Sequence, residues 1–221
     1  MTGLIFDCDG VLVDSEKMSC GAWLPVLRRR GVEATLEKIE SFIGKSDRAV
    51  LEHFRARHPM PMPPGDEEIL AEREHEYFAQ ARGRLKGFTN EREVLVELRR
   101  CGYRMAVASS GRPQKIRFNL EQAGILDLFE VTVSATEVVR GKPAPDLFLL
   151  AAKKLGIVGS RCAVVEDSTF GITAACLAGM HAIGFCSSQP DAALRSAGAR
   201  RTIADYRDLP PLLVELGLGA S

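Results

Sequence analysis

The stretch "LIFDCDGVLVDSE", residues 4–16, places two carboxylates directly after a short apolar run. Asp7 and Asp9 stand two residues apart, with Cys8 between them and Gly10 behind them. A short apolar run is typical of a buried strand, and acids at its end indicate either a turn or a chemical site. A chemical site needs partner residues elsewhere in the chain, so the rest of the sequence decides between the two. Gly10 is expected to allow a tight backbone turn.

Further apolar runs of the same kind recur along the chain. They lie at residues 104–108, 131–133, 162–165 and 182–185. Most are separated by segments with helical spacing of apolar residues, at 112–123, 145–155 and 171–178. Strands that alternate with helices predict a parallel sheet covered on both faces. The expected fold is α/β, a Rossmann-like three-layer parallel sheet core.

The segment after the first strand differs from the rest. Helical patterns dominate it, at residues 15–30, 36–43, 49–57 and 66–82, and the loop "HPMPMPPG" at 58–65 separates the last two. Pro25 is expected to kink the first of these helices. We therefore predict an inserted all-helical cap over residues 16–86, and a core domain made of residues 1–15 and 87–221.

Composition restricts the classes of function. The 221 residues are 46% hydrophobic and 26% charged, with a formal net charge of zero. This balance gives no basic field for nucleic acid, and no apolar run approaches the roughly 20 residues of a membrane helix. Six cysteines without a CxxC pair predict reduced thiols in a cytoplasmic protein. The sequence leaves the oligomeric state open, with a monomer favoured.

Polar residues follow each of the first four predicted strands. Ligands of open parallel sheets bind beyond the carboxyl ends of the strands, so these residues are expected to converge on one edge. Besides Asp7 and Asp9, the set comprises Ser109 and Ser110 after the second strand, Lys142 after the third, and Glu166 and Asp167 after the fourth.

This combination of side chains favours phosphoryl transfer. Clustered carboxylates repel one another unless a cation neutralises them, and oxygen ligands select a hard ion such as Mg²⁺. A lysine and a hydroxyl beside them can hold phosphate oxygens, and two neighbouring acids can act as nucleophile and proton shuttle. Each feature alone is usually a turn, a helix cap or a solvated loop. Their ordered recurrence at strand ends predicts an aspartyl-phosphate mechanism, a small phosphorylated metabolite as partner, and Cys8 as a spacer.

Four motifs carry a resemblance to a known family. "FDCDGVLVDSE", "VASSG", "RGKPAPDLF" and "VVEDSTFGITAACLAGM" resemble the four motifs of the haloacid dehalogenase superfamily. The chain resembles the branch with a small helical cap inserted after the first motif, and within that branch it is similar to beta-phosphoglucomutases and small sugar-phosphate phosphatases. The resemblance implies Asp7 as nucleophile and Mg²⁺ ligand. It implies Asp9 as general acid and base, with its backbone carbonyl on the metal.

The later motifs receive their roles from the same resemblance. Ser109 would hold the transferring phosphoryl group, and Lys142 would neutralise that group and orient Asp7. Asp167 would be a metal ligand. Glu166 would contact the metal directly or through water, and the sequence leaves these two arrangements open.

Departures from relatives narrow the function. Dehalogenases of the superfamily lack the second acid of the pair, so Asp9 argues for phosphorus chemistry. Phosphonate-cleaving relatives use a cap lysine, for which Lys38 and Lys45 are weak candidates. Mutase caps resemble one another in a histidine and an arginine, and here Ser19 and Asp47 stand at those positions.

The leading prediction is a Mg²⁺-dependent phosphatase acting on a sugar or polyol phosphate. Lys45, Ser46 and Arg48 are the cap residues expected to grip the substrate, with Ser110 contributing from the core. A phosphosugar mutase and a non-catalytic phosphate-binding or scaffolding protein stay open as alternatives.

Overall fold

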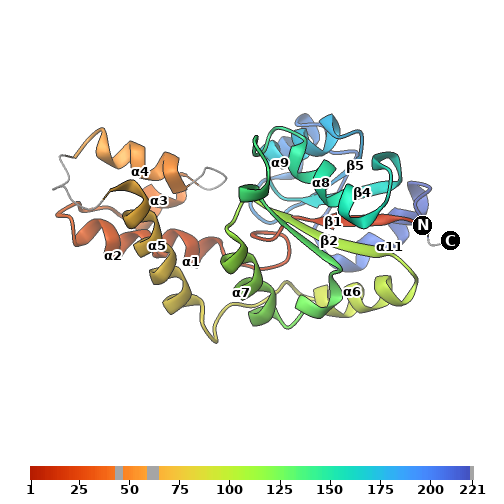
Figure 1. The fold of residues 1–221 in the computed structure, drawn as a ribbon, viewed down its shortest axis with the longest axis horizontal. Helices are drawn as coiled ribbons and strands as arrows, with labels where there is room; N and C mark the ends of the chain where they lie inside the picture. Colours follow the sequence, from red (N-terminus) through yellow and green to blue (C-terminus); the bar gives the residue numbers. More distant parts are fainter. Residues whose placement is uncertain (43–46, 59–64, 220–221) are drawn as a thin grey trace. The chain divides into compact units, whose positions relative to one another are not determined.

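The computed structural model describes residues 1–42, 47–58 and 65–219, which form two compact units. The sheet unit comprises Met1–Asp14 and Lys86–Ser221, and the helical unit comprises Ser15–Leu85. Figure 1 shows the helical unit in red to yellow and most of the sheet unit in green to blue. The sequence predicted that the helical unit begins at residue 16 and ends at residue 86. In the structure it begins at Ser15 and ends at Leu85.

The sheet unit contains one six-stranded parallel sheet in the order β3-β2-β1-β4-β5-β6. Its strands are β1 Gly3–Phe6, β2 Arg104–Ser109, β3 Val131–Ser134, β4 Cys162–Glu166, β5 His181–Phe185 and β6 Arg201–Ile203. The five predicted strands and the α/β fold class are confirmed. The sequence missed β6, because this edge strand has only three residues and lacks a continuous apolar run.

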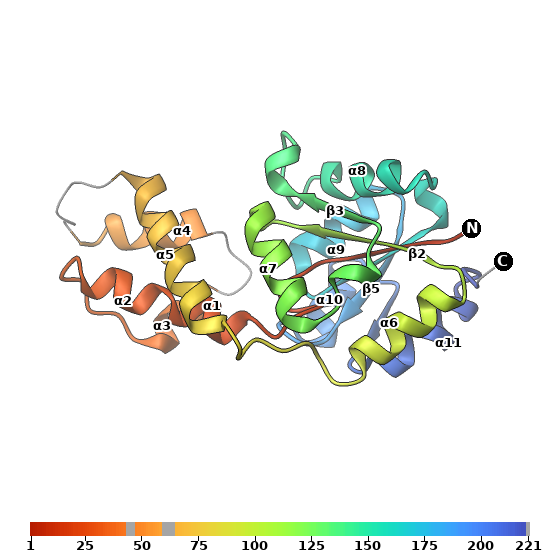
Figure 2. The ribbon, with the colours of Figure 1, turned by 60° about the horizontal axis from the view of Figure 1, so that its bottom comes forward.

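Helices cover both faces of this sheet (Figure 2). They are α6 Glu91–Arg100, α7 Pro113–Ala123, α8 Asp146–Leu155, α9 Thr169–Leu177, α10 Asp191–Ser196 and α11 Leu209–Glu215. Short 3₁₀ turns lie at Leu126–Leu128, Ala135–Glu137, Gly159–Arg161 and Tyr206–Asp208. Ile5 and Val164 pack in one core cluster with Phe148 of α8 and Ile172 of α9. Side chains alternate along a strand, so the buried Leu4 and Phe6 face the other helical layer.

Strand register determines where the polar motif residues emerge. Phe6 pairs with Val107 on one side and with Val165 on the other. All strands run in the same direction, so the residues after β1, β2 and β4 leave the sheet at its carboxyl edge. The sheet therefore brings together residues that are up to about 160 positions apart in sequence.

The helical unit packs around its own apolar core. Its helices are α1 Glu16–Gly21, α2 Trp23–Arg28, α3 Leu36–Glu40, α4 Asp47–Arg55 and α5 Asp66–Ala81. Trp23, Leu51 and Ile69 belong to one buried cluster. No strand occurs among the described residues of this unit.

The prediction of a single helix over residues 15–30 is wrong. The segment is divided at Ala22 into α1 and α2. Pro25 has no N–H and cannot donate to the carbonyl of Gly21, so the helical hydrogen-bond ladder is interrupted at this point. Of the loop predicted at 58–65, residues 59–64 lie outside the described residues.

The first residue of α6, Glu91, is a buried acid that lies outside the four sequence motifs. Glu91 is only 2% exposed, and within the described part of the chain its Oε1 atom has no hydrogen-bond partner. Burial raises the pKa of Glu91 to about 9, although a backbone hydrogen bond from Phe88 partly opposes the shift. The folded protein therefore binds this proton more tightly than the unfolded chain does, and Glu91 is protonated at neutral pH.

We expect Glu91→Gln to stabilise the protein in alkaline solution. The stability that protonated Glu91 gives the native state is lost progressively as pH rises from the unfolded pKa near 4.5 to about 9, because folding must then take up a proton that the unfolded chain has released. At pH 8 the neutral amide should raise the free energy of unfolding by roughly 2 kcal/mol or more. Urea unfolding between pH 5 and pH 9 measures the effect. Glu93→Gln, an exposed change on the same helix, is the control. A variant no more stable than wild type at pH 8 would contradict the expectation.

Candidate active site

Asp7 stands at the centre of the carboxyl edge of the sheet. Its backbone N–H donates to the carbonyl of Val165 at 3.0 Å, which continues the pairing of β1 with β4 for one residue beyond the strand. This bond places Asp7 level with Glu166, the last residue of β4. The side chain of Asp7 is almost fully buried, so its charge is poorly hydrated.

Three buried carboxylates form a cluster at this edge. Asp7, Glu166 and Asp167 each offer an oxygen, and these oxygens lie within 4.8 Å of one another. Burial raises the pKa of Asp7 from 3.8 to about 7; Lys142 opposes the shift, and Glu166 and Asp9 add to it. A compact set of hard oxygen donors with excess negative charge fits a divalent cation such as Mg²⁺.

Lys142 is the cation of this cluster. Its Nζ atom lies 2.5 Å from Asp7 Oδ1 and 2.6 Å from Glu166 Oε1. Burial by itself lowers the pKa of Lys142, but the two ion pairs outweigh it and hold the pKa above its ordinary value. The ammonium group also lies 4.9 Å from the ring centre of Phe148. Lys142 therefore keeps its charge while it contacts both carboxylates.

Glu166 is fixed from the side of α9. The backbone N–H of Ser168 donates to Glu166 Oε2 at 2.6 Å, and the Ser168 hydroxyl donates to the same oxygen at 2.9 Å. A Cβ on Gly171 would lie 1.8 Å from Glu166 Oε1, so only glycine fits there. Because donors already contact both oxygens, the choice between direct and water-mediated metal contact stays a prediction.

Gly10 allows the loop after β1 to approach Asp167. Its φ is +76°, and a Cβ at this position would lie 2.1 Å from Asp167 Oδ2. Ser187, which follows β5, donates to the Gly10 carbonyl and lies 3.4 Å from the same carboxylate oxygen. The sequence analysis missed Ser187, although its position after a strand was a usable signal.

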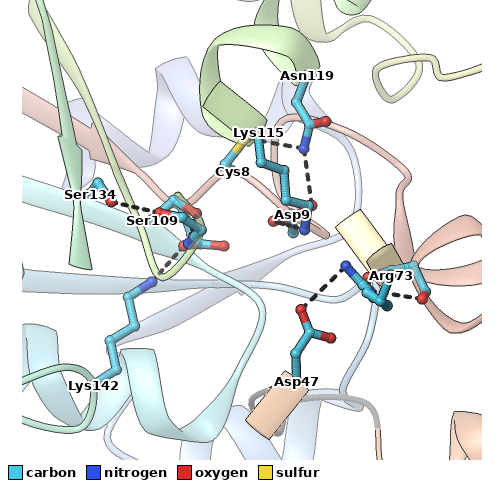
Figure 3. A network of polar contacts seen from close by, with 12 residues as sticks. Cys8, Asp9, Asp47, Arg73, Ser109, Lys115, Asn119, Ser134 and Lys142 are labelled. Carbon is cyan, nitrogen blue, oxygen red and sulfur yellow. Dashed lines mark hydrogen bonds and ion pairs between the residues drawn. The ribbon is translucent and has the colours of Figure 1, made fainter. Parts of the chain in front are cut away.

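Asp9 is directed toward α7. Lys115 Nζ lies 2.9 Å from Asp9 Oδ2, and Asn119 Nδ2 donates to Asp9 Oδ1 at 3.1 Å, as Figure 3 shows. The sequence analysis missed both donors. They lie on the buried face of α7 one position before Ile116 and Leu120, a pattern that pure apolar spacing does not reveal.

Cys8 has the surroundings of an unreactive thiol. It is completely buried, and Asn119 lies 3.8 Å from its sulfur. Burial raises the pKa of Cys8 well above its ordinary value, and Asp9 and Asp7 raise it further. The thiol stays protonated and is a poor nucleophile, as expected of a spacer. All six cysteines are free.

The two serines after β2 have different environments. Ser109 is buried, and its Oγ accepts a hydrogen bond of 3.1 Å from the Gly111 N–H. The Gly111 carbonyl accepts from Ser134 Oγ at 2.7 Å, which fixes the turn. Ser110 is exposed, so its substrate role stays a prediction.

The three cap residues predicted to bind the substrate belong to the helical unit. Lys45 and Ser46 lie outside the described residues. Arg48 is half exposed and forms ion pairs with Glu67 and, at 3.6 Å, with Asp66. Its positive charge is therefore already partly neutralised within this unit.

Ser19 and Asp47, the two departures from the mutase pattern, share one partner. Arg73 of α5 donates to the backbone and hydroxyl oxygens of Ser19 and lies 3.2 Å from Asp47 Oδ2 (Figure 3). Trp23 Nε1 also donates to Asp47, at 3.2 Å. Arg73 is buried, and the sequence analysis gave it no role.

Comparison with known proteins gives similarity along most of the chain. The family described as "Haloacid dehalogenase-like hydrolase" matches residues 4–185. Hexitol phosphatase A of Escherichia coli (strain K12) is 35% identical over 185 residues, covering 82% of this chain and 81% of that protein. Protein SUPPRESSOR OF QUENCHING 1, chloroplastic, of Arabidopsis thaliana is 34% identical over 202 residues. That match covers 90% of this chain but only 19% of the relative, so this chain spans about a fifth of that longer protein.

One solved structure is similar in fold over nearly the whole chain. The crystal structure of a HAD family hydrolase from Deinococcus radiodurans R1, with bound phosphate and sodium, has a TM-score of 0.77 and 32% identity. The match covers 99% of this chain and 97% of that one. Among the described residues, no helix has the length and apolar character needed to cross a membrane.

Proposed function

This chain belongs to the haloacid dehalogenase-like hydrolase family, and we propose that it is a Mg²⁺-dependent phosphatase acting on a small sugar or polyol phosphate. The observation that carries the proposal is the buried cluster of Asp7, Glu166 and Asp167 with Lys142 in contact with two of them. A buried nucleophile, excess carboxylate charge and a fixed lysine suit the transfer of a dianionic phosphoryl group.

The reaction proceeds in two displacements on this chain's residues. Asp7 Oδ attacks phosphorus to form an aspartyl-phosphate, while Asp9 gives its proton to the departing alcohol oxygen. Asp9 then takes a proton from water, which attacks the phosphorus, releases phosphate and restores Asp7. Ser109 and Lys142 hold the phosphoryl oxygens through both steps.

Mg²⁺ would be held by carboxylate oxygens of Asp7 and Asp167, by the Asp9 backbone carbonyl, and by Glu166 directly or through water. When bound, it offsets negative charge on the phosphoryl oxygens. Its ligands are the hard oxygen donors that this ion prefers in proteins.

A phosphate-release assay over a panel of phosphorylated metabolites tests the proposal. We expect free phosphate in the presence of Mg²⁺ and none in EDTA. Isomerised sugar phosphate without release would indicate a mutase. No turnover across the panel would indicate a binding or scaffolding protein. Repeating the panel on Arg48→Ala tests whether the exposed arginine contributes to substrate choice.

Asp9→Ala should slow cleavage of poor leaving groups far more than that of good ones. Loss of the proton donor is expected to lower kcat/KM for phenyl phosphate by about 10²- to 10⁴-fold. The value for p-nitrophenyl phosphate should fall much less, because nitrophenolate needs little protonation. Steady-state kinetics on both esters measure the ratio, with Asp14→Ala, an exposed acid of the same loop, as control. Equal losses on the two esters would argue against Asp9 as the acid.

A further inference from the structure

The carboxylate of Asp9 is held by two donors on a single helix face. Lys115 contacts one oxygen at 2.9 Å and Asn119 contacts the other at 3.1 Å. The two donors are four residues apart on α7, so they lie one turn apart on the same side of the helix. Each oxygen of the carboxylate is therefore contacted by a different donor.

Burial distinguishes the donors from the group that they hold. The side chain of Lys115 is 11% exposed and Asn119 is completely buried, whereas the side chain of Asp9 is 22% exposed. Burying an ammonium and an amide is costly unless each is paired, and here Asp9 is a common partner of both. The donors form the fixed part of the arrangement, and the carboxylate is its most solvent-accessible member.

The two contacts are compatible with proton chemistry at Asp9. A carboxylate oxygen has two lone pairs, so one donor on an oxygen does not by itself prevent that oxygen from accepting a proton. Loss of these donors would remove two contacts that restrict rotation of the carboxylate, so fewer encounters would find it in a productive orientation. Since α7 directly follows β2, one strand–helix segment supplies both Ser109 and the two donors.

We propose that Lys115 and Asn119 are the positioning residues of the acid–base group Asp9. The inference rests on the proposed function, because it takes Asp9 as the group that protonates the leaving oxygen and activates water. In this proposal Lys115 and Asn119 act through Asp9.

Leaving-group selectivity tests the inference on the Mg²⁺-loaded enzyme. Lys115→Met removes the ammonium while keeping a chain of similar length, and Asn119→Ala is the second variant. Each should lower kcat/KM for phenyl phosphate by about 10- to 100-fold, and that for p-nitrophenyl phosphate by no more than about threefold. Lys115→Arg, which keeps a cationic donor, should recover part of the loss.

A double variant separates positioning from general damage. Asp9→Ala with Lys115→Met should be no slower than Asp9→Ala alone, because residues that act as a unit are not additive. Arg117→Met is the matched control: Arg117 is an exposed residue of α7 paired with Glu121 and should leave both esters unaffected.

Two outcomes would overturn the inference while leaving the function in place. One is normal selectivity in Lys115→Met and Asn119→Ala when Asp9→Ala loses it. The other is a further loss of rate when Lys115→Met is added to Asp9→Ala. Unchanged selectivity in Asp9→Ala itself would instead count against the acid–base role in the proposed function.

Discussion

Asp7→Asn is expected to abolish phosphate release while the protein stays folded. An amide cannot attack phosphorus, so no aspartyl-phosphate forms, and loss of a nucleophile lowers kcat by at least about 10⁴-fold. The measurement is phosphate release with Mg²⁺, together with mass spectrometry of the quenched protein for a phosphoryl adduct on the residue 7 peptide. Asp14→Asn, at an exposed acid of the same loop, should retain activity. Substantial release by freshly purified Asp7→Asn, free of deamidated protein, would remove the basis of the proposed mechanism.

The same substitution should stabilise the metal-free protein. Burial raises the pKa of Asp7 to about 7, so the folded protein holds this proton more tightly than the unfolded chain does. Stability contributed by the protonated group is therefore complete below pH 3.8, is lost as pH rises toward 7, and is absent above it. At pH 8 in EDTA, Asp7→Asn should unfold with a free energy roughly 2–4 kcal/mol higher than wild type, because the ionised carboxylate is removed while Lys142 keeps Glu166 as its partner.

Added Mg²⁺ provides the control for this second effect. A ligand that binds only the folded state stabilises it by mass action, and wild type should gain more than a variant that lacks one metal ligand. The stability difference between the two should narrow as Mg²⁺ is titrated. A variant less stable than wild type in EDTA at pH 8 would show that ionised Asp7 is not destabilising.

Lys142→Met should impair both activity and stability. The change removes the ammonium that lies 2.5 Å from Asp7 and 2.6 Å from Glu166 and leaves buried carboxylates without their cation. Removing one partner of a buried ion pair typically costs about 3–5 kcal/mol. Loss of a charge that holds the phosphoryl group should lower kcat by about 10²- to 10³-fold. Phosphate release and urea unfolding at pH 7.5 measure the two effects.

Added Mg²⁺ and a variant of a more exposed ion pair serve as controls for Lys142→Met. Mg²⁺ should restore part of the lost stability, because it also neutralises the cluster, but should not restore the rate. Lys154→Met removes an ammonium whose pair with Glu137 is 37% exposed on both sides, and should cost no more than about 1 kcal/mol. An equal loss of unfolding free energy in the two lysine variants would mean that the buried Lys142 ion pairs stabilise the protein no more than the exposed Lys154 pair does.

The sequence by itself determined the fold class and the order of the motif residues. Short apolar runs predicted five strands. Asp7, Ser109 and Glu166 each lie at or next to the end of one of these strands. Parallel strands share one carboxyl edge, so this local information predicts that distant residues lie at one edge, as Asp7, Glu166 and Asp167 do. The resemblance to a family supplied expected roles, which chain position alone does not give.

Only the tertiary structure decided what surrounds Asp9. Lys115 and Asn119 occupy ordinary positions of a helix. The sequence alone does not distinguish a polar residue on the buried face of a helix from one on its solvated face. The partner of Ser19 and Asp47 was equally unreadable, because Arg73 reaches them from a helix that begins about 20 residues beyond Asp47. Backbone periodicity is a local property, whereas the facing of two elements depends on how the whole chain packs. For this reason Asp7 could be proposed as the nucleophile from the sequence, but the two side chains that contact its neighbour Asp9 could not be predicted.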